Sequence, residues 1–581
     1  MLTEQSDHRF RIEELIDSAR WSEAQQAIAD LWRCAPGAAT AAWILPRIAK
    51  LSAHLGFSEH RVAFLRSFTV EPVVPILRAS AFASGIALKT YVGEFNAYAQ
   101  ELLETGKLDE FRPDTVILAV QTRDIAPELW EGPEDPAAFN PICERVLADM
   151  RSYIAAFRRR RKANIIVHDL ELPAHLATGL LDTQSLKGQA LTIRQINEGL
   201  RSLAAEFSGV FVLAYDDLIA RQGRLRWSDE RKWLAMRMPF TAESLGYMAQ
   251  EWLKFIVCLA GKQSKVIVAD LDNTLWGGLA GEDGLSGIKL GKDYPGAAYR
   301  AVQQALLHCH RRGILLAIAS KNNEQDAMEI IDSHPEMLLR RSHFSAWRLN
   351  WNNKAHSIRE IARELNVGLD AIAFIDDSPF ERAAMRSELP EVAVIELPSD
   401  AMGYAEAIRA CPLLERLTLS LEDSERARYY RQQQERANMA RSVASIEDFY
   451  RSLAQRIEVA TVEDTTVVRV AQLTNKTNQF NLTTRRYTEQ QIRHFAGQLG
   501  WKVYYASVTD RFGDNGIVAV IITRTEERVC EIDSFLMSCR VIGRTVETAL
   551  LSFLVQETRA AGMEYLRGRY VRTKKNAPAA N

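Results

Sequence analysis

The middle of this 581-residue chain contains two acidic pairs whose residue types and spacing suit phosphoryl transfer. Asp270 and Asp272 form the first pair, and Asp376 and Asp377 form the second. Two carboxylates two residues apart at a strand end can share one Mg²⁺, while one attacks phosphorus and the other handles the proton of the leaving group. The second pair would add hard oxygen ligands to the same Mg²⁺ site. Because Asp-x-Asp also occurs in turns and calcium loops, the interpretation depends on the residues that accompany it.

A hydroxyl and an amine lie between the two acidic pairs. Ser320 follows an apolar run, where its hydroxyl and nearby backbone N–H groups can hold phosphate oxygens. Lys354 supplies a positive charge that balances the nucleophile and the phosphoryl group. These four elements in this order are hard to explain as unrelated core or surface polar residues.

Three apolar runs must bring these groups together. The runs 265–269, 314–318 and 371–375 alternate with amphipathic stretches, which is typical of a parallel sheet flanked by helices. In such sheets the site lies beyond the carboxyl ends of the strands, so the polar clusters should converge. The stretches 275–319 and 321–353 are too short for a large inserted cap domain, which predicts an open site suited to a bulky phosphorylated substrate or a protein partner.

The ordered motifs resemble those of the haloacid dehalogenase superfamily of aspartyl phosphotransferases. The resemblance implies a Rossmann-like domain without a large cap and with Mg²⁺ as cofactor. It implies that Asp270 is the nucleophile that forms an aspartyl phosphate and that Asp272 is the general acid and base. It also implies phosphate binding by Thr274, Ser320 and Lys354, metal binding by Asp270, Asp272 and Asp376, and support of the metal shell by Asp377.

The last part of the chain combines a predicted strand, 529–538, with an amphipathic helix, 543–554. Between them lies a tight turn, with Arg540, Gly543 and Arg544, whose free N–H groups can hold an anion. The turn resembles the pyrophosphate loop of GNAT-type acyltransferases, which implies an α+β domain that places a CoA or phosphopantetheine arm there. Cys539 precedes the turn, and a thiol beside a helix N-terminus and Arg540 should have a lowered pKa. We therefore expect Cys539 to carry an enzyme thioester.

A stretch rich in amides precedes this region. Its residues Asn475, Lys476, Asn478, Gln479 and Asn481 have limited helix propensity. Substrate hydroxyls or a phosphopantetheine arm would use them, and a hydrogen-bonded turn network explains them almost as well.

Three long motifs, 276–284, 473–481 and 537–544, closely resemble the FkbH-like family of polyketide biosynthesis. The resemblance implies an enzyme that takes 1,3-bisphosphoglycerate, removes phosphate and delivers a glyceryl thioester to the phosphopantetheine arm of an acyl carrier protein. A lactyl or related three-carbon group would make similar demands on the thiol. The alternative is a stand-alone Mg²⁺-dependent phosphatase whose C-terminal domain only docks the carrier.

The chain before residue 262 has the texture of another α/β unit. Ser67-Phe68-Thr69 and Val120-Gln121-Thr122-Arg123-Asp124 resemble the first and third blocks of SGNH-type hydrolases. The Asp-x-x-His expected near the end of such a domain is not evident in 227–241. We therefore interpret this unit as a noncatalytic platform for dimer formation or carrier docking, so a homodimer is possible.

Length and composition limit the remaining function classes. A chain of 65.6 kDa is larger than one hydrophobic core usually organises, so we expect several domains. We predict a helical prefix (1–60), an SGNH-like α/β domain (61–261), a phosphatase domain (262–417), a connecting helix (418–445) and a GNAT-like domain (446–581). The net charge of −2 gives no global positive field for nucleic acid or an anionic membrane. Seven cysteines without a CxxC pair argue against a disulfide framework or a structural zinc site. With no signal-peptide pattern at the start and no long apolar run, the expected location is the cytoplasm.

Overall fold

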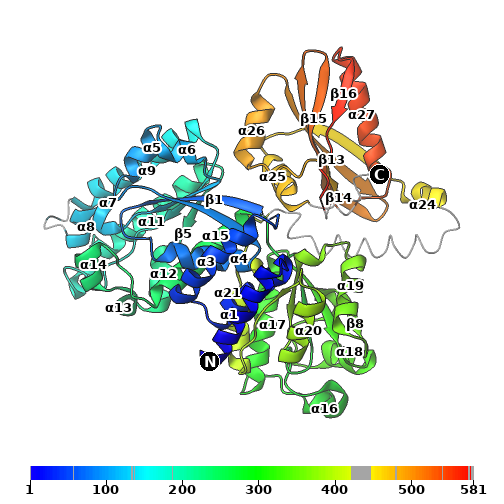
Figure 1. The fold of residues 1–581 in the computed structure, drawn as a ribbon, viewed down its shortest axis with the longest axis horizontal. Coiled ribbons are helices and arrows are strands. Elements are labelled where there is room, and N and C mark those ends of the chain that lie inside the picture. Colours follow the sequence, from blue (N-terminus) through cyan, green and yellow to red (C-terminus); the bar gives the residue numbers. More distant parts are fainter. Residues whose placement is uncertain are drawn as a thin grey trace. The chain divides into compact units, whose positions relative to one another are not determined.

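The computed structural model describes residues 2–56, 58–132, 135, 138–185, 187–419, 446–477, 480–538, 541–573 and 576. The chain forms two compact units, 1–260 and 261–581. Three separate sheets organise it, one in the first unit and two in the second (Figure 1). Within the described part, no helix is long and apolar enough to cross a membrane.

The first unit is built on a five-stranded parallel sheet of order β2-β1-β3-β4-β5. Its strands are β1 (Ser58–Arg66), β2 (Ile86–Val92), β3 (Thr115–Ala119), β4 (Asn164–His168) and β5 (Val210–Leu213). Its helices are α1 (Leu2–Asp17), α2 (Trp21–Cys34), α3 (Ala38–Ser52), α4 (Val73–Ala83), α5 (Tyr98–Leu103), α6 (Lys107–Phe111), α7 (Thr122–Ile125), α8 (Pro127–Glu131), α9 (Phe139–Arg160), α10 (Leu180–Gln184), α11 (Gln189–Glu206), α12 (Tyr215–Gln222), α13 (Arg224–Trp227), α14 (Glu230–Met236) and α15 (Ser244–Leu259). Apolar residues of β1, β3 and β4 pack with α9 and α11 in one core.

The second sheet is also parallel and has the order β10-β9-β6-β7-β8. Its strands are β6 (Val266–Ala269), β7 (Leu315–Ser320), β8 (Phe344–Leu349), β9 (Ile372–Ile375) and β10 (Ala393–Val394). Its α-helices are α16 (Ala280–Gly287), α17 (Gly296–Arg311), α18 (Glu324–Ser333), α19 (Lys354–Glu364), α20 (Pro379–Glu388) and α21 (Tyr404–Ala410), and its short 3-10 helices are Arg341–His343, Leu369–Ala371, Ala401–Gly403 and Pro412–Leu414.

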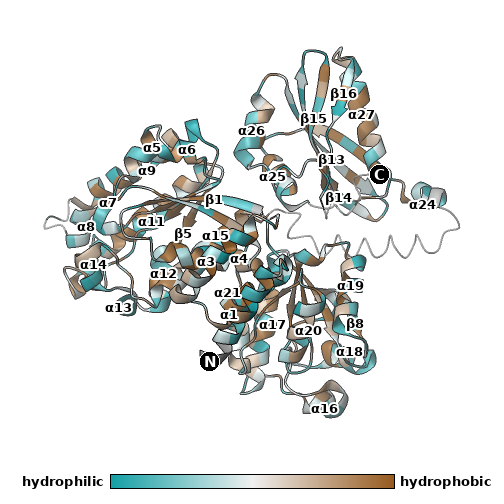
Figure 2. Cartoon of the chain, in the orientation of Figure 1, coloured by the Kyte–Doolittle hydropathy of each residue, from teal (hydrophilic) through white to brown (hydrophobic). Residues whose placement is uncertain are grey.

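The alternating directions of the side chains along β6 explain why helices cover both faces of this sheet. Ile267 and Ala269 enter a core shared with α17, α18 and α21, whereas Val266 and Val268 enter a core shared with α19 and α20. Successive side chains of a strand point to opposite faces, so a fully apolar strand needs cover on both. Figure 2 shows hydrophobic residues concentrated along the strands and on the helix faces that meet them.

The third sheet is mixed, with the order β11-β13-β14-β15-β12 and β16 paired to β15. Its strands are β11 (Arg456–Thr461), β12 (Phe480–Asn481), β13 (Trp501–Asp510), β14 (Gly513–Glu526), β15 (Val529–Met537) and β16 (Tyr565–Gly568). Its helices are α24 (Ile446–Leu453), α25 (Val467–Lys476), α26 (Glu489–Gly497) and α27 (Val546–Ala560). The helix predicted from residue 543 begins three residues later, because Gly543 and Thr545 have positive φ angles that end the turn before the helix. The predicted connecting helix falls largely on 420–445, outside the described residues.

Candidate active site of the middle sheet

The polar clusters predicted from the sequence meet at the carboxyl ends of neighbouring strands. Asp270 follows β6, Ser320 ends β7, and Asp376 follows β9. Because β6 pairs with both β7 and β9, these three ends lie side by side. Lys354 is the first residue of α19, whose start is capped by the Asn353 side chain accepting from Ala355 N at 2.7 Å.

The Lys354 amine joins two of the carboxylates. Its Nζ lies 2.9 Å from Asp270 Oδ1 and donates to Asp376 Oδ2 at 2.6 Å. All three side chains are at most 8 % exposed. Burial alone would lower the pKa of Lys354, but Asp270 and Asp376 outweigh it and raise the pKa. The amine is therefore a fixed positive charge beside Asp270.

Three carboxylates form a group with the chemistry of a cation site. Single oxygens of Asp270, Asp376 and Asp377 lie within 4.8 Å of one another. Burial, followed by the charge of Asp270, raises the pKa of Asp376 to about 6 and that of Asp377 above its ordinary value. Crowded hard oxygens whose ionised forms are disfavoured fit a bound Mg²⁺, because the cation would relieve the repulsion.

The family resemblance implies that Asp272 is a metal ligand. Within the described part of the chain, however, its carboxylate does not belong to this group of three. Its Oδ1 accepts from Trp276 Nε1 at 2.9 Å and from Ala280 N at 3.0 Å, and its Oδ2 accepts from Asn322 Nδ2 at 3.0 Å. The third carboxylate is Asp377, which the sequence places only in a supporting role. Burial raises the pKa of Asp272, and the hydrogen bonds oppose this shift only in part. A carboxyl in this environment is suited to giving and taking protons.

The turn after β6 fixes these positions. Asn273 adopts a left-handed conformation (φ 53°), and its Oδ1 accepts from Gly278 N at 3.0 Å. Gly278 has a φ of 99°, and a Cβ there would lie 2.5 Å from Asp283 Oδ2. The Thr274 hydroxyl is fully buried and accepts from Asp377 N at 3.1 Å. Ser320 Oγ accepts from Asn322 Nδ2 at 3.1 Å.

Sequence reasoning missed Asn322, Trp276 and Arg382. Arg382 lies on α20 and donates to the carbonyl oxygens of Asp376 and Asp377, at 2.8 Å each. It thereby holds the β9–α20 turn that presents both carboxylates. Asn322 follows Ser320 by two residues at the same strand end, so its position was a usable signal, whereas Arg382 gives none before the fold is known.

The predicted phosphopantetheine residues of the third sheet are only partly described. Cys539, Arg540, Asn478 and Gln479 lie outside the described residues, as does the side chain of Lys476. The Asn475 amide donates to Ala471 O at 3.0 Å and to Tyr487 O at 2.9 Å, and this residue lies in the last turn of α25. Gly543 is exposed, with open space where a side chain would be, whereas Arg544 is 6 % exposed and lies 3.4 Å from Asp510 Oδ2.

In the first unit, Ser67 directly follows β1, and Asp124 lies on α7, the helix after β3. Ser67 is fully buried, and its Oγ accepts from Gln121 N at 3.0 Å. Among the described residues of this unit, the two buried histidines bond elsewhere, His60 to Thr115 Oγ1 and His168 to Trp252 Nε1. A buried hydroxyl with these partners gives no support to a serine nucleophile.

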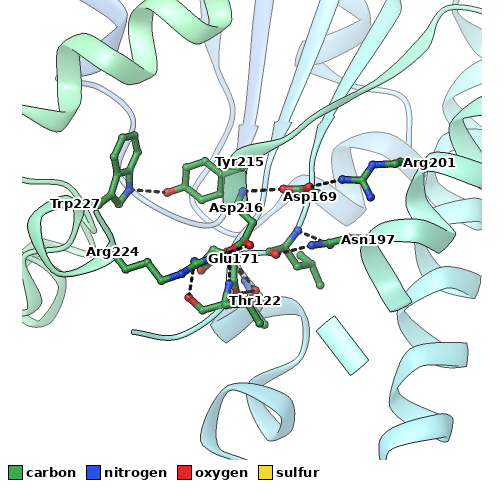
Figure 3. A network of polar contacts seen from close by, with 11 residues as sticks. Thr122, Asp169, Glu171, Asn197, Arg201, Tyr215, Asp216, Arg224 and Trp227 are labelled. Atoms are coloured by element: carbon green, nitrogen blue, oxygen red, sulfur yellow. Dashed lines mark hydrogen bonds and ion pairs between the residues drawn. The ribbon is translucent and has the colours of Figure 1, made fainter. Parts of the chain in front are cut away.

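A polar network ties the end of β4 to the helices around it (Figure 3). Glu171 accepts from Thr122 N at 3.1 Å, and Asp216 binds Arg224 through both oxygens, at 2.6 and 2.8 Å. Asp169 accepts from Asp216 N at 2.9 Å. These bonds join loops to α7, α12 and α13, which is a structural task.

Comparison with solved structures identifies a phosphatase-containing relative. The N-terminal part of the protein BF1531 from Bacteroides fragilis, described as containing a phosphatase domain complexed with Mg, has a TM-score of 0.57 and 25% identity, and the match covers 62% of this chain and 96% of that one. This match agrees with a mixed α/β fold with parallel sheets.

Two acetyltransferase structures match more weakly. The ribosomal-protein-alanine N-acetyltransferase of Brucella melitensis biovar Abortus 2308 is 14% identical and covers 20% of this chain and 82% of its own. The ribosomal-protein-S18-alanine N-acetyltransferase of Escherichia coli is 15% identical, and the match covers 22% of this chain and 73% of that one. Both have a TM-score of 0.17, which is too low to support a function.

No family model and no curated protein matches the chain.

Proposed function

We propose that the middle sheet carries a Mg²⁺-dependent phosphatase in which Asp270 forms an aspartyl phosphate. The observation that carries this proposal is the buried Lys354 amine between Asp270 and Asp376, with Asp377 completing a group of three carboxylates. The similarity to a structure that contains a phosphatase domain complexed with Mg supports it.

The residues divide the reaction into two steps. An Asp270 carboxylate oxygen attacks phosphorus, and the bond from phosphorus to the leaving oxygen breaks while Lys354 balances the charge. Asp272, whose pKa is raised by burial, gives its proton to the leaving oxygen. Water then attacks phosphorus, Asp272 takes a proton back, and phosphate and the Asp270 carboxylate are released. Mg²⁺, held by Asp270, Asp376 and Asp377, would neutralise charge on the phosphate oxygens.

Release of phosphate from p-nitrophenyl phosphate tests this assignment. We expect activity that requires Mg²⁺, disappears in Asp270→Asn and persists in Asp293→Asn, because Asp293 is an exposed residue of the same domain. Equal activity of both variants would contradict the assignment of Asp270.

We further propose that the natural substrate is 1,3-bisphosphoglycerate and that the glyceryl unit passes through Cys539 to an acyl carrier protein. The Cys539 thiolate attacks the acyl carbonyl, a C–S bond forms, and the C–O bond breaks as phosphate leaves with the electron pair. The Asp270 site removes the other phosphate, and the phosphopantetheine thiol of the carrier then displaces Cys539. Support comes from the motifs 276–284, 473–481 and 537–544 and from the position of Cys539 in the connection between β15 and α27.

Loading of a carrier protein separates this function from that of a stand-alone phosphatase. With 1,3-bisphosphoglycerate, Mg²⁺ and a phosphopantetheinylated carrier, we expect the carrier to gain the mass of a glyceryl group. Phosphate release without any carrier adduct would favour the stand-alone phosphatase.

A further inference from the structure

A cavity of about 280 Å³ lies at the edge of the middle sheet opposite to the carboxylate group. Ser320 marks the carboxyl end of β7, whereas the cavity lies beside the end of α17, just before β7 begins at Leu315. α17 packs against α21, and both helices contribute to the lining (Figure 1). The lining consists of Ala305, His308, Cys309, Arg311, Arg312 and Arg409. The cavity therefore shares no residue with the proposed phosphatase site.

The lining of this cavity is strongly basic. Arg311, Arg312 and Arg409 each bring a guanidinium group, and no acidic residue is among the described residues of the lining. Arg312 Nη1 lies 3.0 Å from Glu415 Oε2, so Glu415 compensates one of these charges. Within the part of the chain that the structure describes, the side chains of Arg311 and Arg409 make no ion pair and no hydrogen bond. Two positive charges of the lining are thus left without a counter-ion among the described residues.

The contacts of Arg312 hold its guanidinium group beside the cavity. In addition to the ion pair with Glu415, its Nη2 donates to Cys309 Sγ at 3.3 Å. Its Nε is buried and has no hydrogen-bond partner among the described residues. Burial raises the pKa of the Cys309 thiol, so this thiol stays neutral and brings no negative charge to the cavity. An arginine that is already held in place loses little conformational entropy when a ligand binds.

Helix dipoles do not account for this arrangement. Basic side chains are common in the last turn of a helix, where they face the negative end of its dipole. At the end of α17, however, Cys309 O accepts from Ile314 N at 3.1 Å and His310 O accepts from Gly313 N at 2.9 Å. These carbonyl oxygens therefore already have backbone donors. Guanidinium groups from two helices that meet at one cavity exceed what about half a charge at each helix end requires.

The charge and size of the cavity suit a small dianion with several acceptor oxygens. Guanidinium groups only donate hydrogen bonds, and their planar fork matches the oxygens of a phosphate group. A phosphate monoester carries about 1.5 to 2 negative charges at neutral pH, which matches the two arginines without a described counter-ion. Pockets for drug-sized ligands have volumes of about 300 to 1,000 Å³. A cavity of about 280 Å³ is therefore suited to inorganic phosphate or a small phosphate ester.

We propose that the cavity between α17 and α21 binds the phosphate group of a small ligand through Arg311, Arg312 and Arg409. Inorganic phosphate and a small phosphate ester share this chemistry. The inference goes beyond the proposed function and does not depend on it, because no lining residue belongs to the site at Asp270.

Calorimetric titration of the full chain with inorganic phosphate tests the proposal. EDTA is present to remove Mg²⁺, because carboxylates without a bound cation repel an anion from the site at Asp270. We expect saturable binding to the natural chain that persists in Lys354→Met, and we expect acetate, which has a single charge, to bind much more weakly. Tighter binding of glycerol 3-phosphate than of phosphate would identify an ester as the ligand, and the reverse order would identify the free ion.

Variants of exposed residues locate the binding. Arg409→Gln and Arg311→Gln should each raise the dissociation constant of phosphate by about tenfold to a hundredfold, because each removes a charge-assisted hydrogen bond. Arg409→Lys should lose less affinity than Arg409→Gln. Arg363→Gln is the matched control, because Arg363 is an exposed arginine in the last turn of α19 that does not line the cavity. The thermal midpoint of each variant confirms folding.

Three results would overturn the proposal. The first is the absence of saturable phosphate binding, and the second is unchanged binding in both Arg311→Gln and Arg409→Gln. Loss of binding in Lys354→Met, with these two variants unaffected, would likewise place the phosphate in the site at Asp270. Binding of oligoglutamate that Arg409→Gln abolishes, without binding of phosphate, would assign the cavity to an acidic protein partner instead.

Discussion

At the scale of single residues, the chemistry depends on charges that are buried together. Lys354 compensates two carboxylates that would otherwise lie in the interior without a counter-ion. Removing one partner of such a group lowers the stability of the fold, because the remaining charges stay buried away from water. In the proposed phosphatase, the same arrangement would prepare Asp270 for attack on phosphorus.

Lys354→Met should therefore change both activity and the response to Mg²⁺. We expect phosphatase activity to fall by about a hundredfold to a thousandfold, as for other preorganised charge stabilisers. Without the amine, Mg²⁺ becomes the main source of positive charge, so it should raise the thermal midpoint more in the variant than in the natural chain. Lys321→Met is the control, because Lys321 binds Glu381 at 2.7 Å with 40 % exposure. Equal Mg²⁺ responses in all three proteins would contradict the account.

Asp272 and Asp377 should separate proton transfer from metal binding. Asp377→Asn should weaken Mg²⁺ binding measured by calorimetric titration, because Asp377 belongs to the carboxylate group. Asp272→Asn should leave that binding nearly unchanged and slow turnover by about a hundredfold to ten-thousandfold through loss of the acid and base. The reverse pattern would support Asp272 as the metal ligand that the sequence resemblance implies.

At the scale of elements, strand ends were more predictable than the contacts around them. The apolar runs before Asp270, Ser320 and Asp376 place these residues at one sheet edge, because parallel strands share the direction of their carboxyl ends. The cavity between α17 and α21 gives no signal in the sequence, since it depends on how the two helices pack. Arg382 likewise acts through backbone carbonyls that only the folded turn brings within reach.

The network at the end of β4 should make the first unit sensitive to pH (Figure 3). Burial raises the pKa of Glu171 to about 8, from 4.5 when exposed. Between these values the folded unit holds a proton that the unfolded chain has lost. The stabilisation of the folded unit by this proton is therefore complete below about pH 4.5 and is lost as the pH rises through about 8.

Glu171→Gln should remove this dependence. Scanning calorimetry across pH 5 to 9 should show a smaller decline of the unfolding midpoint in the variant than in the natural chain. A residual slope near pH 6 should remain, because burial also raises the pKa of Asp169 to about 6. Glu198→Gln should behave like the natural chain, since Glu198 is 74 % exposed. An unchanged slope in Glu171→Gln would show that this carboxyl does not hold its proton.

At the scale of the whole molecule, the charges are balanced locally. The net charge of −2 is the sum of local charges of both signs, which include the carboxylate group of the middle sheet and arginines elsewhere in the chain, such as Arg485. Because the two proposed chemistries use different residues, they should be separable by mutation. Asp270→Asn should abolish phosphate release from p-nitrophenyl phosphate and leave loading of Cys539 from a glyceryl thioester of N-acetylcysteamine intact. Loss of both activities, with folding preserved, would show that the two sites are not independent.

The intact mass of the chain after incubation with 1,3-bisphosphoglycerate and Mg²⁺ shows whether Cys539 carries a glyceryl thioester. We predict a glyceryl adduct that is absent in Cys539→Ala and persists in Cys34→Ala, because Cys34 is an exposed cysteine outside the third sheet. An adduct that persists in Cys539→Ala, or no adduct on the natural chain while phosphate is still released, would contradict the proposed thioester.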